Sequence, residues 1–264
     1  MKKNAKWRLI ISGALSGPEN MAIDEALFSL SEKSGYAGTL RIYFWEPACI
    51  SLGYFQEKEN ILNIALCKAR GIDITRRITG GGAIYHHGEI TYSITTTLPN
   101  PLVPLNVDES YRHLEDFIIN GIWKCGAEVN YRGTSRPRAK DFYCFARPSK
   151  YDVVKKGKKL AGSAQRRSKN LFLQHGSILL NLDELDAMFS VLKLDCNIEK
   201  AKQEFRGNVT SLDEITGKNL EKHEVAMRLT GEFEKTYAVT LTEDELTPDE
   251  TRMSKELIKK YSLI

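Results

Sequence analysis

The sequence predicts an α+β protein in which mixed β-sheets are flanked by helices. Short stretches rich in β-branched and aromatic residues recur along the chain, and amphipathic stretches with helical spacing lie between them. The two kinds of stretch do not alternate regularly, as they would in a doubly wound parallel fold. A mixed sheet is therefore the better prediction.

Three helices are predicted in the first half of the chain. The first follows Pro18, the second runs from about Ile61 to Arg70 and stops at Gly71, and the third ends at Gly126. Helical stretches also make up most of the chain after residue 180. Apolar residues that share one helical face mark the first and third helices: Ile23, Ala26, Leu27 and Leu30, then Tyr111, Leu114, Ile118 and Ile122.

Strands are predicted where β-branched and aromatic residues cluster between turn residues such as Glu46-Pro47. Two more are expected around a turn at Lys156-Gly157, and a further short pair from two stretches near residue 175. The predicted strands are Leu40–Phe44, Ile50–Tyr54, Ile72–Thr75, Ile90–Thr97, Tyr151–Val154, Lys159–Ala161, the pair Leu171–Gln174 and Ser177–Leu180, and a short strand near Tyr237–Leu241.

A glycine-rich loop is the first candidate for chemistry. Arg76 and Arg77 precede Thr79 and three successive glycines, and His86 follows them. Glycines let backbone N–H groups approach a ligand closely, and an arginine at the loop entrance is a candidate anion clamp. His86 and the later His175 are equally compatible with structural and functional roles, and neither lies in a recognisable Ser–His–Asp order.

A cysteine and a lysine form the second candidate. Periodicity disappears from Gly133 to Pro148, which predicts a long loop, and this loop carries Cys144. Most cysteines are inert, and the flanking aromatic residues can equally anchor the loop to the core. A nucleophilic thiol needs a nearby cation, because its ordinary pKa of about 8.5 leaves little thiolate at neutral pH. Lys159 can supply that charge, although its position alone favours a solvated hairpin lysine.

Composition limits the classes of protein. The 264 residues are 42% hydrophobic and 27% charged, as in ordinary globular proteins, and no linker or repeat divides them. We therefore expect one domain over residues 1–264. The apolar stretch Leu9–Ile11 is too short for a signal peptide or a membrane span. The net charge of +4 favours an acidic partner, and no nucleic-acid-binding motif is present.

The cysteines indicate the redox compartment. An odd number without paired spacing suits reduced cytoplasmic thiols better than disulfides or a metal site. They are Cys49, Cys67, Cys125, Cys144 and Cys196.

Several motifs in order resemble the lipoate ligase and octanoyltransferase branch of the biotin/lipoate protein ligase superfamily, over most of the chain. The resemblance implies the catalytic-domain fold of that superfamily, and we expect no C-terminal accessory domain of the kind that full-length bacterial ligases commonly add. The motifs are Pro18–Leu27, Leu40–Tyr43, Trp45-Glu46-Pro47, Ser51–Gln56, the Arg77–His86 loop, Tyr92-Ser93, Gly162–Gln165 and Gln174-His175-Gly176.

The segment around Cys144, with Lys159 fifteen positions on (159 − 144 = 15), is similar to octanoyltransferases of the LipM type. That resemblance implies transfer of octanoate from acyl carrier protein, through a cysteine thioester, to a lysine of a lipoyl domain. Acceptors would be proteins such as glycine cleavage H protein or the acyltransferase subunits of 2-oxo-acid dehydrogenases. Cys144 and Lys159 would be catalytic, with no cofactor or metal. The implied substrate-binding residues are Arg77, Gly80, Gly81, Gly82, Ala83, His86, Gly162, Ser163, Ala164, His175 and Gly176.

Three alternatives stay open. In an ATP-dependent lipoate ligase, which would use ATP and Mg²⁺, Cys144 would be incidental, and the third glycine of the loop is more typical of that group. An amidotransferase would move octanoate between two lipoyl domains. A non-catalytic acyl-binding or lipoyl-domain-binding module would turn over neither donor.

Overall fold

The computed structural model describes residues 5–133, 148–194 and 197–263. The strands are β1 (Lys6–Leu15), β2 (Thr39–Trp45), β3 (Cys49–Leu52), β4 (Asp73–Arg76), β5 (Ile84–His86), β6 (Glu89–Thr97), β7 (Asn130–Tyr131), β8 (Val153–Lys155), β9 (Lys158–Ser168), β10 (Leu171–Leu179) and β11 (Thr240–Glu243). The helices are α1 (Gly17–Ser29), α2 (Lys58–Ile61), α3 (Ile64–Ala69), α4 (Val107–Lys124), α5 (Leu185–Val191), α6 (Ile198–Asn208), α7 (Leu212–Thr216), α8 (Lys222–Tyr237) and α9 (Pro248–Tyr261), with a 3₁₀ turn at Ser31–Lys33.

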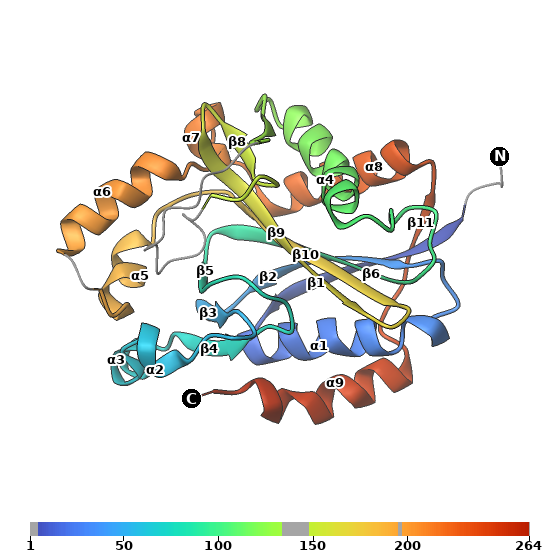
Figure 1. The fold of residues 1–264 in the computed structure, drawn as a ribbon, viewed down its shortest axis with the longest axis horizontal. Helices are drawn as coiled ribbons and strands as arrows, with labels where there is room; N and C mark the ends of the chain where they lie inside the picture. Colours follow the sequence, from blue (N-terminus) through green and yellow to red (C-terminus); the bar gives the residue numbers. More distant parts are fainter. Residues whose placement is uncertain (1–4, 134–147, 195–196, 264) are drawn as a thin grey trace.

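Two sheets organise these elements (Figure 1). The larger has eight strands in the order β11-β1-β2-β6-β10-β9-β8-β7, and the smaller has the order β4-β3-β5. β1 is parallel to both of its neighbours, whereas β2, β6, β10, β9, β8 and β7 pair antiparallel. The mixed sheets and flanking helices confirm the predicted fold class.

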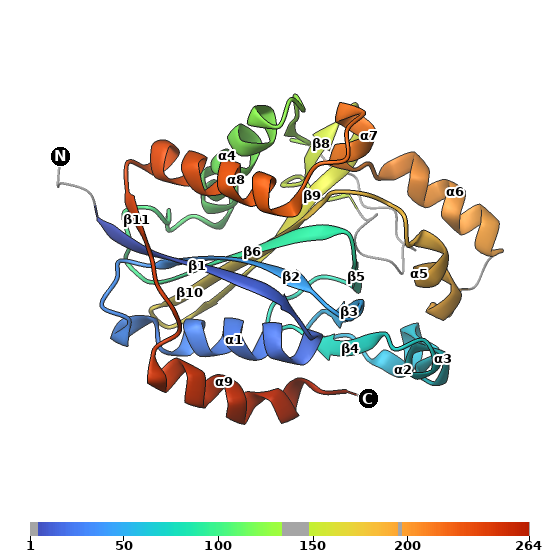
Figure 2. The ribbon, with the colours of Figure 1, turned by 180° about the vertical axis from the view of Figure 1, so that it is seen from behind.

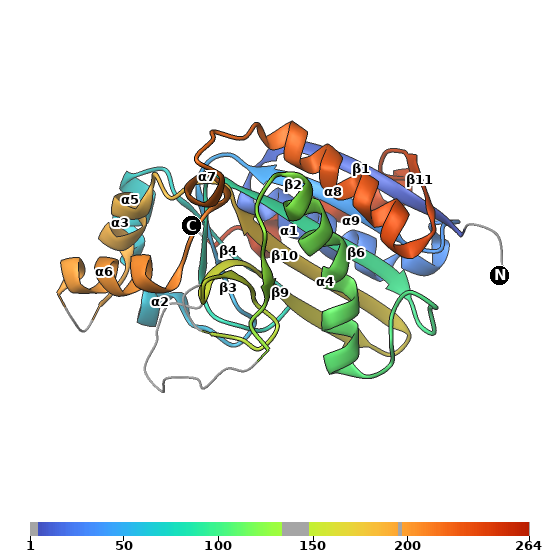
Figure 3. The same ribbon diagram turned by 90° about the horizontal axis from the view of Figure 1, so that it is seen from above.

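Helices cover both faces of the larger sheet. α1 and α9 pack together on one face, and α4 and α8 lie side by side on the other (Figures 1, 2 and 3). Edge-to-face aromatic contacts of Phe117 on α4 with Tyr92 on β6 and with Phe233 on α8 join the second layer to the sheet. No helix in the described ranges has the length and apolar character that crossing a bilayer requires.

Local sequence signals explain the helix ends. Ser16 and Glu19 form a capping box at the start of α1, and Pro18 occupies its first turn. α4 ends as predicted, because Gly126 takes a positive φ of 89° just beyond the helix. The predicted helix from Ile61 to Arg70 is shorter, since α3 begins only at Ile64 and Ile61 is the last residue of the separate helix α2. The break falls where Leu62 bridges Leu192 and where Asn63 caps α3.

Several strand predictions need correction. The expected strand Lys159–Ala161 is part of the longer β9, which continues to Ser168, and β5 and β7 were not predicted. β1 was not predicted, because its buried Arg8 interrupts the apolar pattern. The expected pair near residue 175 is one strand, β10, which pairs with β6 and β9 along its length. Gly176 sits inside it because a Cβ there would lie 2.8 Å from the Gly162 carbonyl oxygen. Tyr237 ends α8, and the short strand begins only at Thr240.

Candidate active site

A cavity lies between the two sheets. One wall comes from β3, β5 and the glycine loop, and the other from β9 and β10. Its lining residues are Met21, Tyr43, Trp45, Ser51, Arg77, Gly80, Gly81, Ile84, His86, Thr91, Lys159, Gly162, Ser163, Ala164, His175, Gly176 and Ser177.

Most of the residues that the sequence singled out meet at this cavity. Gly82 and Ala83 are the exceptions, since neither lines it and Ala83 is fully buried. Cys144 lies outside the described residues. The structure therefore brings both glycine-bearing segments to one site, and substrate binding by their residues stays a prediction.

The buried guanidinium of Arg77 organises the glycine loop. It donates hydrogen bonds to the carbonyl oxygens of Ser51 (2.9 Å), Gly80 (3.0 Å) and Gly82 (2.7 Å). From the other side Gly53 approaches so closely that a Cβ there would lie 1.8 Å from the Gly81 carbonyl oxygen. The loop is thus a fixed wall. A contact between Arg77 and an anion stays a prediction.

His86 occupies the middle of a buried polar chain. Its Nδ1 lies 2.6 Å from a carboxylate oxygen of Glu89, and its Nε2 lies 2.6 Å from the hydroxyl of Ser51. A carboxylate only accepts, so Nδ1 carries the proton, and the Nε2 of a neutral ring then accepts from Ser51. The indole of Trp45 stacks on the imidazole with the ring centroids 3.8 Å apart. Position and tautomer of this ring are both fixed.

His175 occupies a second chain of the same kind. Its Nδ1 lies 3.1 Å from Asp24, and its Nε2 lies 2.6 Å from the hydroxyl of Thr79. Burial lowers the pKa of His175 more than Asp24 raises it, so the ring is neutral at pH 7. Burial by itself raises the pKa of Asp24, but the hydrogen bond from His175 and the charge of Arg41 outweigh it, and the net shift is downward.

Both histidines therefore lie in a hydroxyl–histidine–carboxylate chain, although sequence order revealed neither. The partners come from distant elements. His175 contacts Asp24 on α1 and Thr79 in the glycine loop, and His86 contacts Ser51 on β3. The sequence signal for Asp24 was its place in the motif Pro18–Leu27.

Lys159 is buried at the cavity, so it is not the solvated hairpin lysine that its position favoured. Its Nζ lies 2.8 Å from Oδ1 of Asp152. Oδ2 of Asp152 accepts from the backbone N–H of Ser149 at 2.7 Å and from Arg132 at 3.3 Å. Asp152 was not predicted as part of the site. It holds the ammonium group at one end of the cavity.

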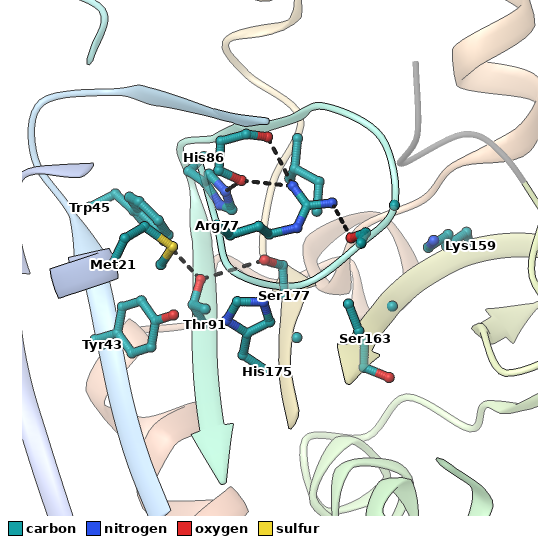
Figure 4. A pocket seen from close by; sticks show the side chains of 17 residues that line it. Met21, Tyr43, Trp45, Arg77, His86, Thr91, Lys159, Ser163, His175 and Ser177 are labelled. Atoms are coloured by element: carbon teal, nitrogen blue, oxygen red, sulfur yellow. Dashed lines mark hydrogen bonds between the residues drawn. The ribbon is translucent and has the colours of Figure 1, made fainter. Parts of the chain in front are cut away.

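The opposite end is apolar and aromatic. Figure 4 shows Met21, Tyr43 and Trp45 on the far side of Arg77 and Ser177 from Lys159. Trp45 donates to the hydroxyl of Thr91 at 2.8 Å, so its only polar atom is satisfied. The cavity therefore has an ammonium group at one end and aromatic side chains at the other.

A buried carboxyl group lies behind β9. Glu115 on α4 accepts a hydrogen bond from the hydroxyl of Ser163. Burial raises the pKa of Glu115 to about 8, and the negative charge of Asp152 adds to the effect, while the Ser163 hydrogen bond and the Lys159 charge oppose it. Glu115 is therefore largely protonated at pH 7, and it adds little negative charge near Lys159.

The described cysteines do not resemble nucleophiles. Cys49, Cys67 and Cys125 are buried free thiols, and burial raises the pKa of each. Within the described ranges no group of three or more histidine, cysteine or acidic side chains is placed to hold a metal ion.

Fold and site together define a protein with a cavity between two sheets that is lined by buried polar and aromatic side chains. The family model of the lipoyl protein ligase A/B catalytic domain matches residues 16–234. The chain belongs to this family, in which its relatives are acyltransferases.

Two relatives illustrate the similarity. An octanoyltransferase LipM of Anoxybacillus flavithermus is 37% identical, with 97% of this chain and 95% of that protein covered. The octanoyltransferase LipM of Brevibacillus brevis is 34% identical, with 96% and 95% covered.

Solved structures agree on the fold. A bi-partite lipoate protein ligase from Thermoplasma acidophilum, described with its E2 lipoyl domain, has a TM-score of 0.78 and 25% identity over 97% of this chain and 93% of its own. A lipoate-protein ligase A bound with ATP has a TM-score of 0.76 and 24% identity, with 97% and 95% covered.

Proposed function

We propose that this enzyme transfers an octanoyl group from octanoyl-acyl carrier protein to a lysine of a lipoyl domain through a thioester on Cys144, without a nucleotide cofactor. The observation that carries the proposal is the buried Lys159–Asp152 pair at one end of a cavity whose other end is apolar. Octanoyl transfer in lipoate biosynthesis is also what the relatives support. The setting proposed for it is the cytoplasm.

The cavity matches an acyl chain held at its carbonyl end. The hydrocarbon tail would lie against Met21, Tyr43 and Trp45, where each buried CH₂ contributes about 0.8 kcal/mol. The carbonyl would then lie towards Lys159. Backbone N–H groups of Gly80–Gly82 or of Gly162–Ala164 are candidates for binding the developing oxyanion.

Lys159 balances the protons of both steps. The Cys144 thiolate attacks the donor carbonyl, the carbon–sulfur bond to the carrier breaks, and the carrier thiolate takes a proton from the Lys159 ammonium. The acceptor amine then attacks the Cys144 thioester, its surplus proton passes to the neutral Lys159, and the thiolate leaves. Asp152 stabilises the charged lysine at the start and end of the cycle.

Cys144 is favoured as the nucleophile on two grounds. The three described cysteines are buried and have raised pKa values. Of the two others, Cys144 stands in the segment that resembles the transferases, whereas Cys196 does not.

Intact-mass measurement after incubation with octanoyl-acyl carrier protein tests the proposal. We expect an octanoyl adduct on the wild type that hydroxylamine removes and that Cys144→Ala lacks, with Cys196→Ala as the matched control that retains it. The absence of an adduct while transfer proceeds would refute the covalent route.

The alternative donors are tested with the same variants. A ligase would convert free octanoate and ATP to pyrophosphate and acylated acceptor, and Cys144→Ala would stay active. An amidotransferase would take the octanoyl group from a second lipoyl domain. A binding module would bind these ligands and turn over none of them.

A further inference from the structure

An aromatic pair stands exposed beside the cavity wall. Phe55 is 86% exposed and Tyr54 is 48% exposed, and their rings meet edge to face with centroids 5.0 Å apart. Adjacent exposed aromatic side chains mark a candidate contact surface for another molecule. With Arg76 and Arg166 they form what we name the aromatic rim.

The rim is held rigidly. The backbone N–H of Gly53 donates to the side-chain oxygen of Gln56 at 2.9 Å, and the N–H of Gln56 returns a bond to the Gly53 carbonyl at 3.0 Å. Arg76 donates to the carbonyl oxygens of Tyr54 (3.2 Å) and Gln56. Exposure of Phe55 therefore does not come from a loosely held loop.

The rim is also attached directly to the glycine loop. The Tyr54 N–H donates to the Thr79 carbonyl at 3.0 Å, and Gly53 packs on the carbonyl of Gly81, which lines the cavity. Arg166 extends from β9 to the Ile78 carbonyl at 2.8 Å. Any macromolecule seated on the rim is therefore adjacent to the cavity.

The charge on the rim is positive. The Arg166 guanidinium lies 5.5 Å from the centre of the Tyr54 ring, and Arg76 supplies a second cation. One carboxylate, Glu57, lies 3.8 Å from Arg76 and is largely solvent-exposed. Two arginines against one acid favour an acidic partner surface, and aromatic and arginine side chains are the residues that most often dominate binding energy at interfaces.

We propose that the aromatic rim is the docking surface for the acceptor protein, at a place where that protein presents its target lysine on an exposed turn flanked by carboxylates. The inference rests on the proposed function, because that function supplies an acceptor protein with a reacting lysine. The acceptor is favoured over the donor because its reacting lysine side chain is short. Only four methylene groups separate a lysine amine from its own Cα, so the acceptor backbone must come close to the cavity. A donor that carries its acyl group on a flexible prosthetic arm has no such constraint.

Kinetics of Phe55→Ser test the inference, with an apo lipoyl domain as the varied acceptor and octanoyl-acyl carrier protein as the donor. We expect the KM for the lipoyl domain to rise at least tenfold, with kcat and the rate of octanoyl adduct formation unchanged. Met227→Ser removes an apolar side chain that is 50% exposed on α8, and it should leave the KM unchanged. Thermal unfolding of both variants should match the wild type, because neither side chain is buried.

Other outcomes would overturn the inference. An unchanged KM in Phe55→Ser would show that the acceptor does not use the rim. Slower adduct formation would assign the rim to the donor or to a segment of this chain. The acceptor KM can also be measured with free octanoate and ATP if the enzyme uses that donor. Failure of the thioester route and failure of the docking surface are therefore distinguishable.

Discussion

The Nζ of Lys159 lies 2.6 Å from the point where a Cβ of residue 162 would stand. Glycine at 162 therefore gives the lysine its place beside Asp152. Lys159 and Gly162 are three positions apart on β9, so the strand that supplies the ammonium group also leaves the space for it.

Gly162→Ala should displace the lysine with little effect on the fold. The group that must move is the end of a flexible side chain, so the fold should persist, and partial separation of the buried Lys159–Asp152 pair should cost up to about 3 kcal/mol of stability. Octanoyl transfer should fall about a hundredfold, because misplacement of a reacting group by 1 Å can cost that much. Gly231→Ala is the control, since no atom of another element in the described part of the chain lies within 4 Å of the place that a Cβ would take there. Wild-type turnover in Gly162→Ala would show that the lysine position is not needed.

Glu115→Gln should change how stability depends on pH. Burial raises the pKa of Glu115 to about 8 from 4.5, so between these values the folded protein holds a proton that the unfolded chain has released. The free energy of unfolding should therefore decrease as pH rises through this window, by about 1.4 kcal/mol per unit from this group alone. Glu115→Gln lacks that contribution. The lowered pKa of His175 affects the wild type and the variant alike, so it cancels when their unfolding free energies are compared. Urea unfolding from pH 5 to 8 measures it, and parallel curves would contradict the assignment.

Glu250→Gln should destabilise the protein by about 3–5 kcal/mol, because it leaves the buried charge of Arg8 without its partner. The two side chains form a paired contact at 2.6 Å and 2.9 Å. In a double-mutant cycle, Arg8→Met with Glu250→Leu should cost less than the two single changes together. Arg252→Gln, which breaks an exposed pair on the same helix, should cost under about 1 kcal/mol. Additive changes at the buried pair would refute the coupling.

Arg77→Lys should loosen the glycine loop. A lysine ammonium cannot reproduce the planar contacts of a guanidinium with three carbonyl oxygens. We expect transfer to fall at least tenfold and the free energy of unfolding to fall by about 2 kcal/mol. Activity assays and chemical denaturation measure both, with the exposed Arg70→Lys as control. Unchanged activity would mean that the loop keeps its shape without these bonds.

Local pattern was sufficient for much of the fold and insufficient where long-range pairing decides. α1 and α4 follow from apolar periodicity with capping residues, and β6 from β-branched residues. β1 was missed because Arg8 is buried by a partner 242 positions away, which no local window contains. The sequence prediction divides β10 at His175-Gly176, whereas the neighbouring Gly162 and Tyr92 require a glycine inside the strand.

The same distinction applies to the site. The motifs predicted two of its segments, and the structure places them on facing walls. Their partners were not predictable from spacing, since 151 positions separate Asp24 from His175. Lys159 was hard to assign for the same reason. Its burial depends on Asp152 and Gly162, and only the folded sheet brings these three together.

The position of the cavity at the seam between the sheets has a physical consequence. An acyl chain bound there would contact both sheets and stabilise the packing of the three-stranded sheet against the eight-stranded one. Amide hydrogens of β3 and β5 should then exchange more slowly with solvent deuterium when the chain is present. Loading of the enzyme would be detectable in backbone protons that take no part in the reaction.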